Sequence, residues 1–135
     1  MIRAVIDTNV VVSAFVNRSG SPAKVLDGAY AGKFVMIADE RIVEVYRRVL
    51  SYVKFKIEKA DVDAFINFVL HNAAFCGKCE KLYGLKMPDD DMKLLEAAGE
   101  LKADFIVTGN ARHFNFREYH NCRIISPSEF VRLYP

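Results

Sequence analysis

Short apolar runs rich in β-branched residues alternate with longer stretches of helical periodicity, and this alternation constrains the fold more than any other feature of the chain. The apolar runs are residues 2–6, 34–38, 103–108 and 123–126. Between them, apolar residues recur every three or four positions, as Ile42, Val45 and Tyr46 do after Asp39. Strands that alternate with helices in this way form α/β proteins. We therefore predict a three-layer α/β/α sandwich with a central, mainly parallel sheet.

The size and charge of the chain favour one globular domain. The chain has 135 residues, and we expect a single domain over residues 1–135. The formal net charge is only +2, so no polybasic tail indicates nucleic-acid binding. The charge is unevenly placed, however, because cations gather in residues 41–59 and acids at 89–91. A basic flank beside an acidic pocket suits a phosphate backbone, although each cation also fits an ordinary solvated helix face.

The apolar segments give no sign of a membrane protein. No apolar run reaches the length of a membrane span, because charged residues interrupt every candidate. The N-terminal apolar segment contains Asp7 and lacks a small-residue cleavage site, which argues against a signal peptide. We therefore expect a cytoplasmic protein with no membrane partner.

The three cysteines do not form a disulfide framework. Cys76 and Cys79 have the spacing of half a zinc site, but no second pair of ligands follows them. A zinc or redox role, a disulfide and plain thiols all stay open at this point. The missing second pair of ligands favours plain thiols.

Three groups of oxygen-bearing side chains follow predicted strands or begin predicted helices. They are Asp7 with Thr8 and Asn9, the acidic run 89–91, and Thr108 with Asn110. Strand ends and the helix starts that follow them share one edge of a parallel sheet, where ligands bind. We therefore expect these groups to converge. For Asp7 the alternative is a purely structural role as a helix cap.

The chemistry of these groups indicates a metal site. Packed carboxylates repel one another and are costly to bury, so a cation or nearby Lys and Arg side chains must neutralise them. Carboxylate, amide and hydroxyl oxygens suit Mg²⁺ or Mn²⁺ better than zinc. The sequence shows no evident Ser–His or Cys–His nucleophile, which favours hydrolysis by an activated water. The residue types alone thus indicate metal-dependent phosphoryl chemistry.

Three blocks of the sequence resemble, in the right order, the signature blocks of PIN-domain ribonucleases. The blocks are residues 5–10 (VIDTNV), 88–98 (PDDDMKLLEAA) and 103–110 (ADFIVTGN). The similarity is greatest to small single-domain members, the VapC-type toxins of toxin–antitoxin pairs. The resemblance implies a PIN-like, doubly wound fold. It also implies a group of acids that bind Mg²⁺ or Mn²⁺ and cleave single-stranded RNA.

Two acids match the family pattern directly. By the resemblance, Asp7 matches the acid at the end of the first strand, and Asp91 matches the acid at the helix start. Both are predicted to bind the metal and to act in catalysis. Asp89 is then predicted to be an auxiliary metal ligand.

Two positions depart from the family pattern. Asn110 stands where a fourth acid is usual; its side-chain carbonyl can still bind the metal, but it adds no charge. The acid on the helix after the second strand falls at Val45 by family spacing, and we predict that neighbouring Glu44 takes its place. Asn110 and Glu44 are therefore also predicted to be catalytic residues, in a site with less negative charge than is usual.

Four residues are predicted to bind the substrate: Asn9, Thr108, Arg112 and His113. The cation of Arg112 suits an RNA phosphate, and a histidine titrates in the range needed for proton transfer. The alternatives are a plain surface position for Arg112 and a packing role for His113 beside an aromatic neighbour.

The leading hypothesis is a metal-dependent endoribonuclease that cleaves single-stranded RNA as the toxin of a toxin–antitoxin pair. The resemblance further implies a homodimer and an antitoxin protein as partners. One alternative is a catalytically degenerate PIN-like domain that binds RNA or protein, which Asn110 and Val45 favour. Another is an aspartyl-phosphate phosphatase or receiver domain. Asn9 disfavours the phosphatase, and the absence of lysine from residues 123–126 disfavours the receiver.

Overall fold

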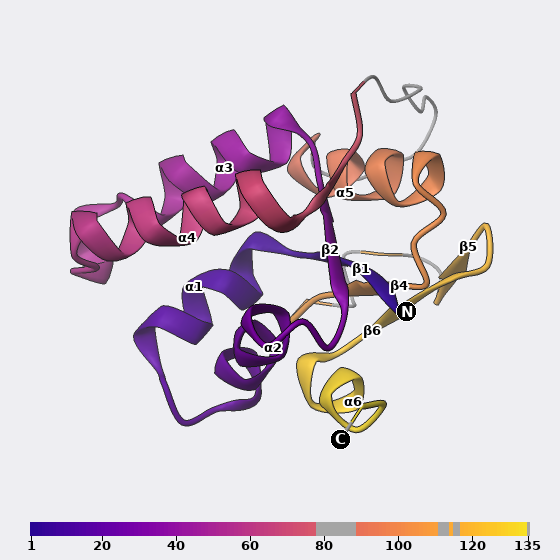
Figure 1. The fold of residues 1–135 in the computed structure, drawn as a ribbon, viewed down its shortest axis with the longest axis horizontal. Coiled ribbons are helices and arrows are strands. Elements are labelled where there is room, and N and C mark those ends of the chain that lie inside the picture. Colours follow the sequence, from indigo (N-terminus) through magenta and orange to yellow (C-terminus); the bar gives the residue numbers. More distant parts are fainter. Residues whose placement is uncertain (78–88, 111–113, 115–116, 135) are drawn as a thin grey trace.

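A six-stranded sheet forms the centre of the computed structural model, which describes residues 1–77, 89–110, 114 and 117–134 (Figure 1). Its strands are β1 (Arg3–Ile6), β2 (Val35–Ala38), β3 (Ala74–Phe75), β4 (Phe105–Val107), β5 (Glu118–Tyr119) and β6 (Cys122–Ile125). The strand order is β3-β2-β1-β4-β6-β5, and every pair is parallel except β5 with β6. The predicted mainly parallel sheet is therefore confirmed.

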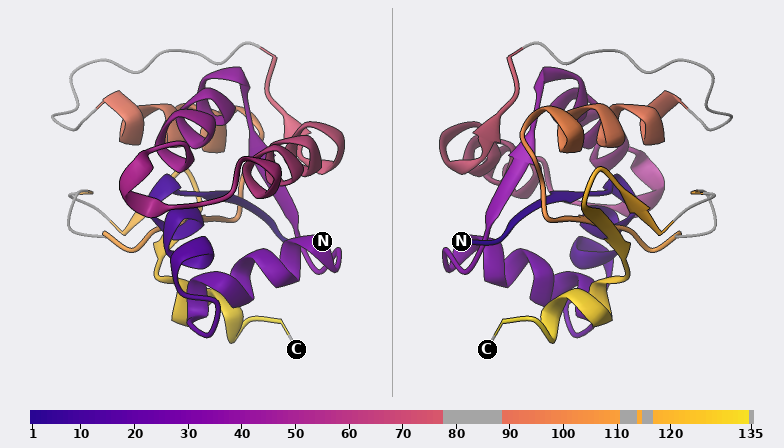
Figure 2. Two further views of the ribbon diagram at one scale, coloured as in Figure 1. Left: turned by 90° about the vertical axis from the view of Figure 1, so that its left-hand side faces the viewer. Right: turned by 90° about the vertical axis from the view of Figure 1, so that its right-hand side faces the viewer.

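Helices lie on both sides of this sheet. They are α1 (Thr8–Val16), α2 (Ser21–Tyr30), α3 (Glu40–Leu50), α4 (Lys59–Asn72), α5 (Asp89–Glu100) and α6 (Pro127–Val131), with a short 3₁₀ helix, η1 (Val53–Phe55). Figures 1 and 2 show α5 on one side of the sheet and α2 with α6 on the other. The paired helices α3 and α4 project beyond the edge at which β1 ends (Figure 1). The predicted three-layer arrangement is thus present, with α3 and α4 extending it at one end.

Local sequence signals explain where several helices begin and end. The Asp39 side chain accepts a hydrogen bond from the Ile42 N–H at 2.8 Å, so this residue caps α3. Ser126 and Glu129 form a capping box at the start of α6. Gly32 follows α2 with a φ of 74°, a left-handed conformation that glycine adopts without steric cost.

The core fills the space between the sheet and the helices. The central strand β1 is fully buried over Ala4, Val5 and Ile6. On the side of α6, the buried ring of Phe130 makes edge-to-face contacts with Phe34 at 4.9 Å and with Phe105 at 5.7 Å. These contacts fix the sheet whose carboxyl edge presents the candidate site.

Some elements differ from the sequence-based prediction. Strands β3 and β5 have two residues each and were not predicted, because so short a run shows no periodicity. Apolar residues at helical spacing after Asp39 continue to Val53 and predict a helix of that length, but the helix ends at Leu50 and Val53 lies in η1. Residues 77–87, whose glycine and lysine content predicts a loop, lie almost wholly outside the described residues.

The cysteines that the structure describes differ in their bonding state. The expectation of plain thiols is wrong for Cys76, which takes part in a disulfide, whereas Cys122 is a buried free thiol. Burial raises the pKa of the Cys122 thiol to about 12, and the nearby Asp104 charge adds to this effect.

In the described parts of the chain, every helix is too short or too polar to cross a bilayer.

Candidate metal centre

Sheet register places the Asp7 side chain beside Thr108. Ile6 pairs with Val107 in the ladder between β1 and β4, and the Asp7 N–H donates to the Val107 carbonyl at 2.9 Å. The two residues that follow these strands are therefore neighbours. The Thr108 hydroxyl donates to Oδ2 of Asp7 at 2.7 Å, and both residues are buried. This hydrogen bond joins residues 101 positions apart in the sequence.

Asp7 does not act as a simple helix cap. It occupies the N-cap position of α1, but its side chain forms no capping hydrogen bond. Its backbone carbonyl accepts from the Val10 N–H at 3.0 Å, as any residue at this position can. The carboxylate is instead turned to Thr108. The contacts of Asp7 therefore differ from those of a plain helix cap, and its role in the site stays a prediction.

Asp91 supplies a second buried carboxylate at the same place. It lies in the first turn of α5 and is 7% exposed. The pKa of Asp7 is raised, first because burial disfavours the charged carboxylate and further because the negative charge of Asp91 is close. The hydroxyl of Thr108 and the backbone amides of Asn9 and Thr8 act in the opposite direction, since they favour the charged form. The centre is thus a pair of like charges in a poorly solvated position.

The donor set of this centre fits a hard divalent cation. Asp7 and Asp91 offer carboxylate oxygens and Thr108 offers a hydroxyl oxygen, which are ligand types that Mg²⁺ and Mn²⁺ prefer. Among the described residues, no group of three or more His, Cys, Asp or Glu side chains is arranged to hold a metal. A cation at this centre would therefore keep several water ligands, as Mg²⁺ does where it binds one or two carboxylates together with substrate phosphates.

The three acids at the start of α5 have different surroundings. Asp91 is buried, whereas Asp89 and Asp90 are exposed. Asp90 accepts hydrogen bonds from Arg48 and Lys93, each at 3.1 Å. The structure therefore brings Asp91 to Asp7, and it leaves Asp90 in a surface ion-pair network. The role of Asp89 as an auxiliary ligand stays a prediction.

The structure does not place Glu44 with the buried acids. Its side chain is 65% exposed and accepts from Arg47 at 3.0 Å on the same helix. Val45, at the position suggested by family spacing, is 5% exposed. The predicted catalytic role of Glu44 therefore has no supporting contact in this conformation of α3.

The predicted substrate-binding residues lie at or near this edge of the sheet where the structure describes them. Oδ1 of Asn9 accepts from the Gly109 N–H at 3.2 Å, which joins the start of α1 to the segment after β4. Asn110 is exposed, and its N–H donates to the Thr108 hydroxyl at 3.0 Å. Arg112 and His113 lie outside the described residues.

Sequence reasoning missed a buried ionic network next to the centre. The Arg41 guanidinium pairs with Asp39 at 2.8 Å and with Glu96 at 2.5 Å, and both carboxylates are about 95% buried. The pKa of Arg41 is raised; burial would lower it, but the hydrogen bonds to Glu96 and Asp39 outweigh burial. Glu96 stands in an otherwise apolar stretch of α5, and this isolated acid was the sequence feature that could have indicated a buried ion pair.

Tyr46 is a second contact that the sequence did not reveal. Its ring is fully buried, and its hydroxyl donates to the backbone carbonyl of Ile6, the residue before Asp7. Burial raises the pKa of Tyr46, and the charges of Asp7 and Asp39 raise it further. The phenol therefore stays protonated as a donor that anchors the end of β1 to α3.

Comparisons with known proteins agree with the fold. The family model described as the PIN domain matches residues 3–112. Among solved structures, the chain is similar to one described as the crystal structure of VapBC2 from Rickettsia felis bound to a DNA fragment from their promoter. The TM-score is 0.62 and the identity 15%, over 93% of this chain and 98% of the other. A search of curated proteins found no match.

The structural likeness supports the fold, and the family model adds the sequence pattern that goes with it. The matched residues include β1, α5 and β4, which together position Asp7, Asp91 and Thr108. The match covers well over half of the chain. The protein therefore belongs to the PIN-domain family.

Proposed function

We propose that this protein is a metal-dependent endoribonuclease that cleaves single-stranded RNA. The observation that supports this proposal best is the buried pair of Asp7 and Asp91, in which Asp7 accepts a hydrogen bond from the Thr108 hydroxyl. A buried pair of like charges is costly to keep, so its presence at the carboxyl edge of a parallel sheet favours a site that binds a cation. Membership of the PIN-domain family points to the same chemistry.

Each residue of the centre has a distinct task in the proposed reaction. Asp7 and Asp91 would bind a divalent cation, which supplies, when bound, Lewis-acid activation for phosphodiester hydrolysis. The Thr108 hydroxyl orients Asp7 through its hydrogen bond to Oδ2 and keeps part of the carboxylate charge compensated. Asn9 holds the segment after β4 against the start of α1, so the oxygen ligands stay at fixed positions.

Cations close to the centre suit an RNA backbone. Lys93 and Arg48 both contact Asp90, the residue before Asp91. A surface cavity of about 600 Å³ lies over α3, and its lining includes these two cations with Arg41 and Arg47. Glu40 and Glu44 also line it, so the cavity is mixed in charge with an excess of cations. Such a surface attracts phosphates toward the buried acids.

We also propose that the chain is the toxin of a toxin–antitoxin pair, with an antitoxin protein as its partner. The support is the structural likeness to the VapBC2 complex, which includes its own partner and promoter DNA. A homodimer and a cytoplasmic location belong to the same proposal.

The test is cleavage of an end-labelled single-stranded RNA in Mg²⁺ or Mn²⁺ and, separately, in EDTA. Asp7→Asn and Asp91→Asn should each abolish cleavage, because each removes one of the two buried carboxylates. Asp90→Asn is the matched control, since it alters an exposed acid on the same helix turn and should keep most of the activity. Wild-type rates for Asp7→Asn would overturn the assignment.

A catalytically degenerate PIN domain that binds RNA or protein is the second candidate. It is favoured by the charge-free side chain of Asn110 and by the outward ion pair of Glu44 with Arg47. In that case the wild-type protein would bind RNA without cutting it, and calorimetric titration with Mn²⁺ would show no binding that depends on Asp7.

A further inference from the structure

The turn between α3 and α4 exposes an unusual set of apolar side chains. This segment, residues 52–56, is called here the 52–56 turn and contains η1, which buries none of its residues. Tyr52 is 43% exposed and Val53 is 89% exposed. The rings of Tyr52 and Phe55 lie nearly parallel, with an interplanar angle of 19° and centroids 6.2 Å apart. The turn therefore presents aromatic surface to solvent and does not add it to the core.

Cations flank these rings in the sequence, and one of them contacts a ring. Nζ of Lys54 lies 5.1 Å from the centroid of the Phe55 ring, and Lys56 is exposed with a left-handed φ of 53°. Residues 47–59 contain five Lys and Arg side chains against the single acid Glu58. In the described parts of the chain, Lys54 and Lys56 enter none of the ion pairs, whereas Lys59 pairs with Asp63. The two turn lysines are therefore available to an anion.

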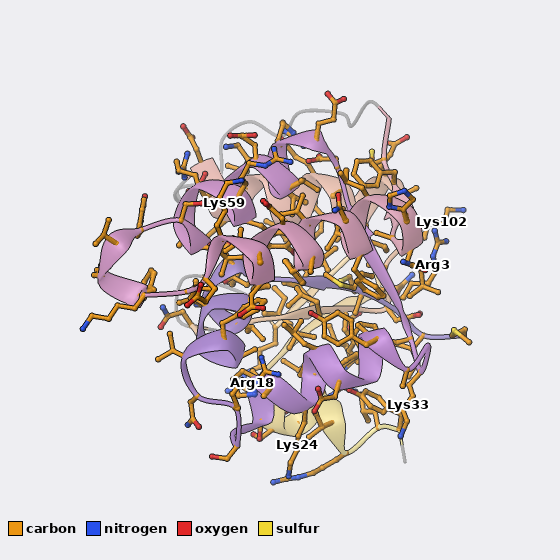
Figure 3. The ribbon with its side chains drawn as sticks, turned by 60° about the vertical axis from the view of Figure 1, so that its left-hand side comes forward. Arg3, Arg18, Lys24, Lys33, Lys59 and Lys102 are labelled. Atoms are coloured by element: carbon orange, nitrogen blue, oxygen red, sulfur yellow. The ribbon has the colours of Figure 1, made fainter. Side chains whose placement is uncertain are left out.

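The 52–56 turn lies at the same end of the molecule as the candidate metal centre. In Figure 1, α3 and α4 extend past the edge where β1 ends, and in the left view of Figure 2 their turn faces the viewer. Figure 3 labels Lys59, at the start of α4, on the opposite side of the view from Arg3 and Lys102. Helix α3 has 11 residues, so the turn lies about 16 Å from the carboxyl end of β2.

Cations also lie along α3, between the centre and the turn. The cavity over α3 is lined by Arg47 and Arg48 near the end of that helix and by Lys93 of α5, two residues after Asp91, together with Glu40 and Glu44. A polyanion that passes along α3 toward Lys54 and Lys56 would therefore meet more cations than acids in this cavity. Aromatic faces combined with a cationic track are the features that bind single-stranded nucleic acid, because bases stack on the rings while phosphates meet the cations.

We propose that the 52–56 turn is a binding platform for single-stranded RNA, outside the metal centre. Tyr52 and Phe55 stack on unpaired bases, and Lys54 and Lys56 contact the flanking phosphates. The platform holds the strand whose other part reaches Asp7 and Asp91. This inference rests on the proposed function for its ligand, but it concerns binding and not cleavage.

The test measures binding in the uncut state, so that it does not depend on cleavage. Full-length protein carrying Asp7→Asn is titrated into a fluorescein-labelled single-stranded RNA in EDTA, and anisotropy gives Kd. Adding Tyr52→Ala should weaken binding about tenfold, because the variant loses the ring on which a base stacks. Tyr52→Phe keeps the ring and should keep the affinity. Tyr30→Ala removes a comparably exposed ring on α2 and is the matched control.

The lysines are tested through salt dependence. Replacing Lys54 and Lys56 together with Gln should lower the slope of log Kd against log salt by about 1.4, because each phosphate contact on a single strand contributes about 0.7. The double Gln variant at Lys24 and Lys33, which Figure 3 labels on α2 and just after it, changes the net charge equally and should leave the slope unchanged.

Each outcome decides the proposal. Loss of affinity in Tyr52→Ala with recovery in Tyr52→Phe supports the platform, even if wild-type protein fails to cut RNA and the proposed function is thereby overturned. Unchanged RNA affinity in Tyr52→Ala overturns it. Unchanged RNA affinity accompanied by a lower dimer content in sedimentation velocity would make the turn a protein interface instead. Circular dichroism melts confirm that the variants are folded.

Discussion

Replacing Arg41 with Met tests whether the buried ionic network holds the site together. One guanidinium contacts two carboxylates that are about 95% buried, at 2.8 Å and 2.5 Å. Met keeps most of the aliphatic stem and removes the charge, so both acids lose the same partner at once. Breaking a buried pair usually costs 3–5 kcal/mol, because a charge is left buried without compensation.

For Arg41→Met, the expected loss in the free energy of unfolding is smaller than the usual cost of breaking a buried pair. The Arg41 side chain is 34% exposed, so water already screens its interactions and can reach the acids once it is gone. We expect a loss of about 2–3 kcal/mol in the free energy of unfolding. Arg47→Met is the matched control on the same helix, because its pair with Glu44 is exposed on both sides and should contribute at most about 1 kcal/mol.

Urea unfolding, followed by far-UV circular dichroism, gives both free energies by linear extrapolation. Combining Arg41→Met with Glu96→Leu should cost less than the sum of the single changes, since the second change removes one of the two carboxylates that Arg41→Met leaves unpaired. Glu96 lies five residues after Asp91, about one and a half helical turns, so weaker Mn²⁺ binding should accompany the loss of stability. Equal effects of Arg41→Met and Arg47→Met would refute the role of the network.

Two further predictions concern the residues around the end of β1. The pKa of Asp7 is raised above its ordinary value of 3.8, so the ionised carboxylate destabilises the folded state at neutral pH. Asp7→Asn should therefore melt at a higher temperature than wild type at pH 7 in EDTA. This difference in melting temperature should fade toward pH 4, and excess Mn²⁺ should reduce it. A lower melting temperature of Asp7→Asn at pH 7 would contradict the raised pKa of Asp7. Tyr46→Phe should lose about 1 kcal/mol through the missing hydrogen bond to the Ile6 carbonyl. Tyr30→Phe is the control for that measurement, and equal unfolding free energies for the two variants would count against the anchoring role.

The sheet and the meeting of its acids could be predicted because both follow from general rules. Asp7, Thr108 and Asp91 end strands or begin a helix, and the carboxyl ends of parallel strands share one edge whatever the length of chain between them. No knowledge of individual contacts was needed. The same rule placed Asp7, a predicted metal ligand, beside Thr108, a predicted substrate-binding residue, although 101 positions separate them.

What escaped prediction depends on contacts without a local signal. Arg41 and Glu96 are 55 positions apart, and neither the spacing nor the composition of either helix marks them as a pair. Strand β5 consists of two residues and exists because it pairs with β6 across a tight turn. The direction in which the Glu44 side chain points depends on how α3 packs against α1, α4 and α5. Because Val45 faces the interior, the neighbouring Glu44 lies on the outer face of the helix.

The hydrogen bond between Thr108 and Asp7 also has a consequence for protein synthesis. Its two residues leave the ribosome far apart in time, and contacts between sequence-distant residues form late in folding. A nascent or truncated chain that stops before β4 has the acid of β1 but lacks the strand and the hydroxyl that hold it in place. On the proposed function, such a chain is inert toward RNA. The messenger that is being translated is therefore not exposed to the activity of the product it encodes until β4 and Thr108 have been synthesised.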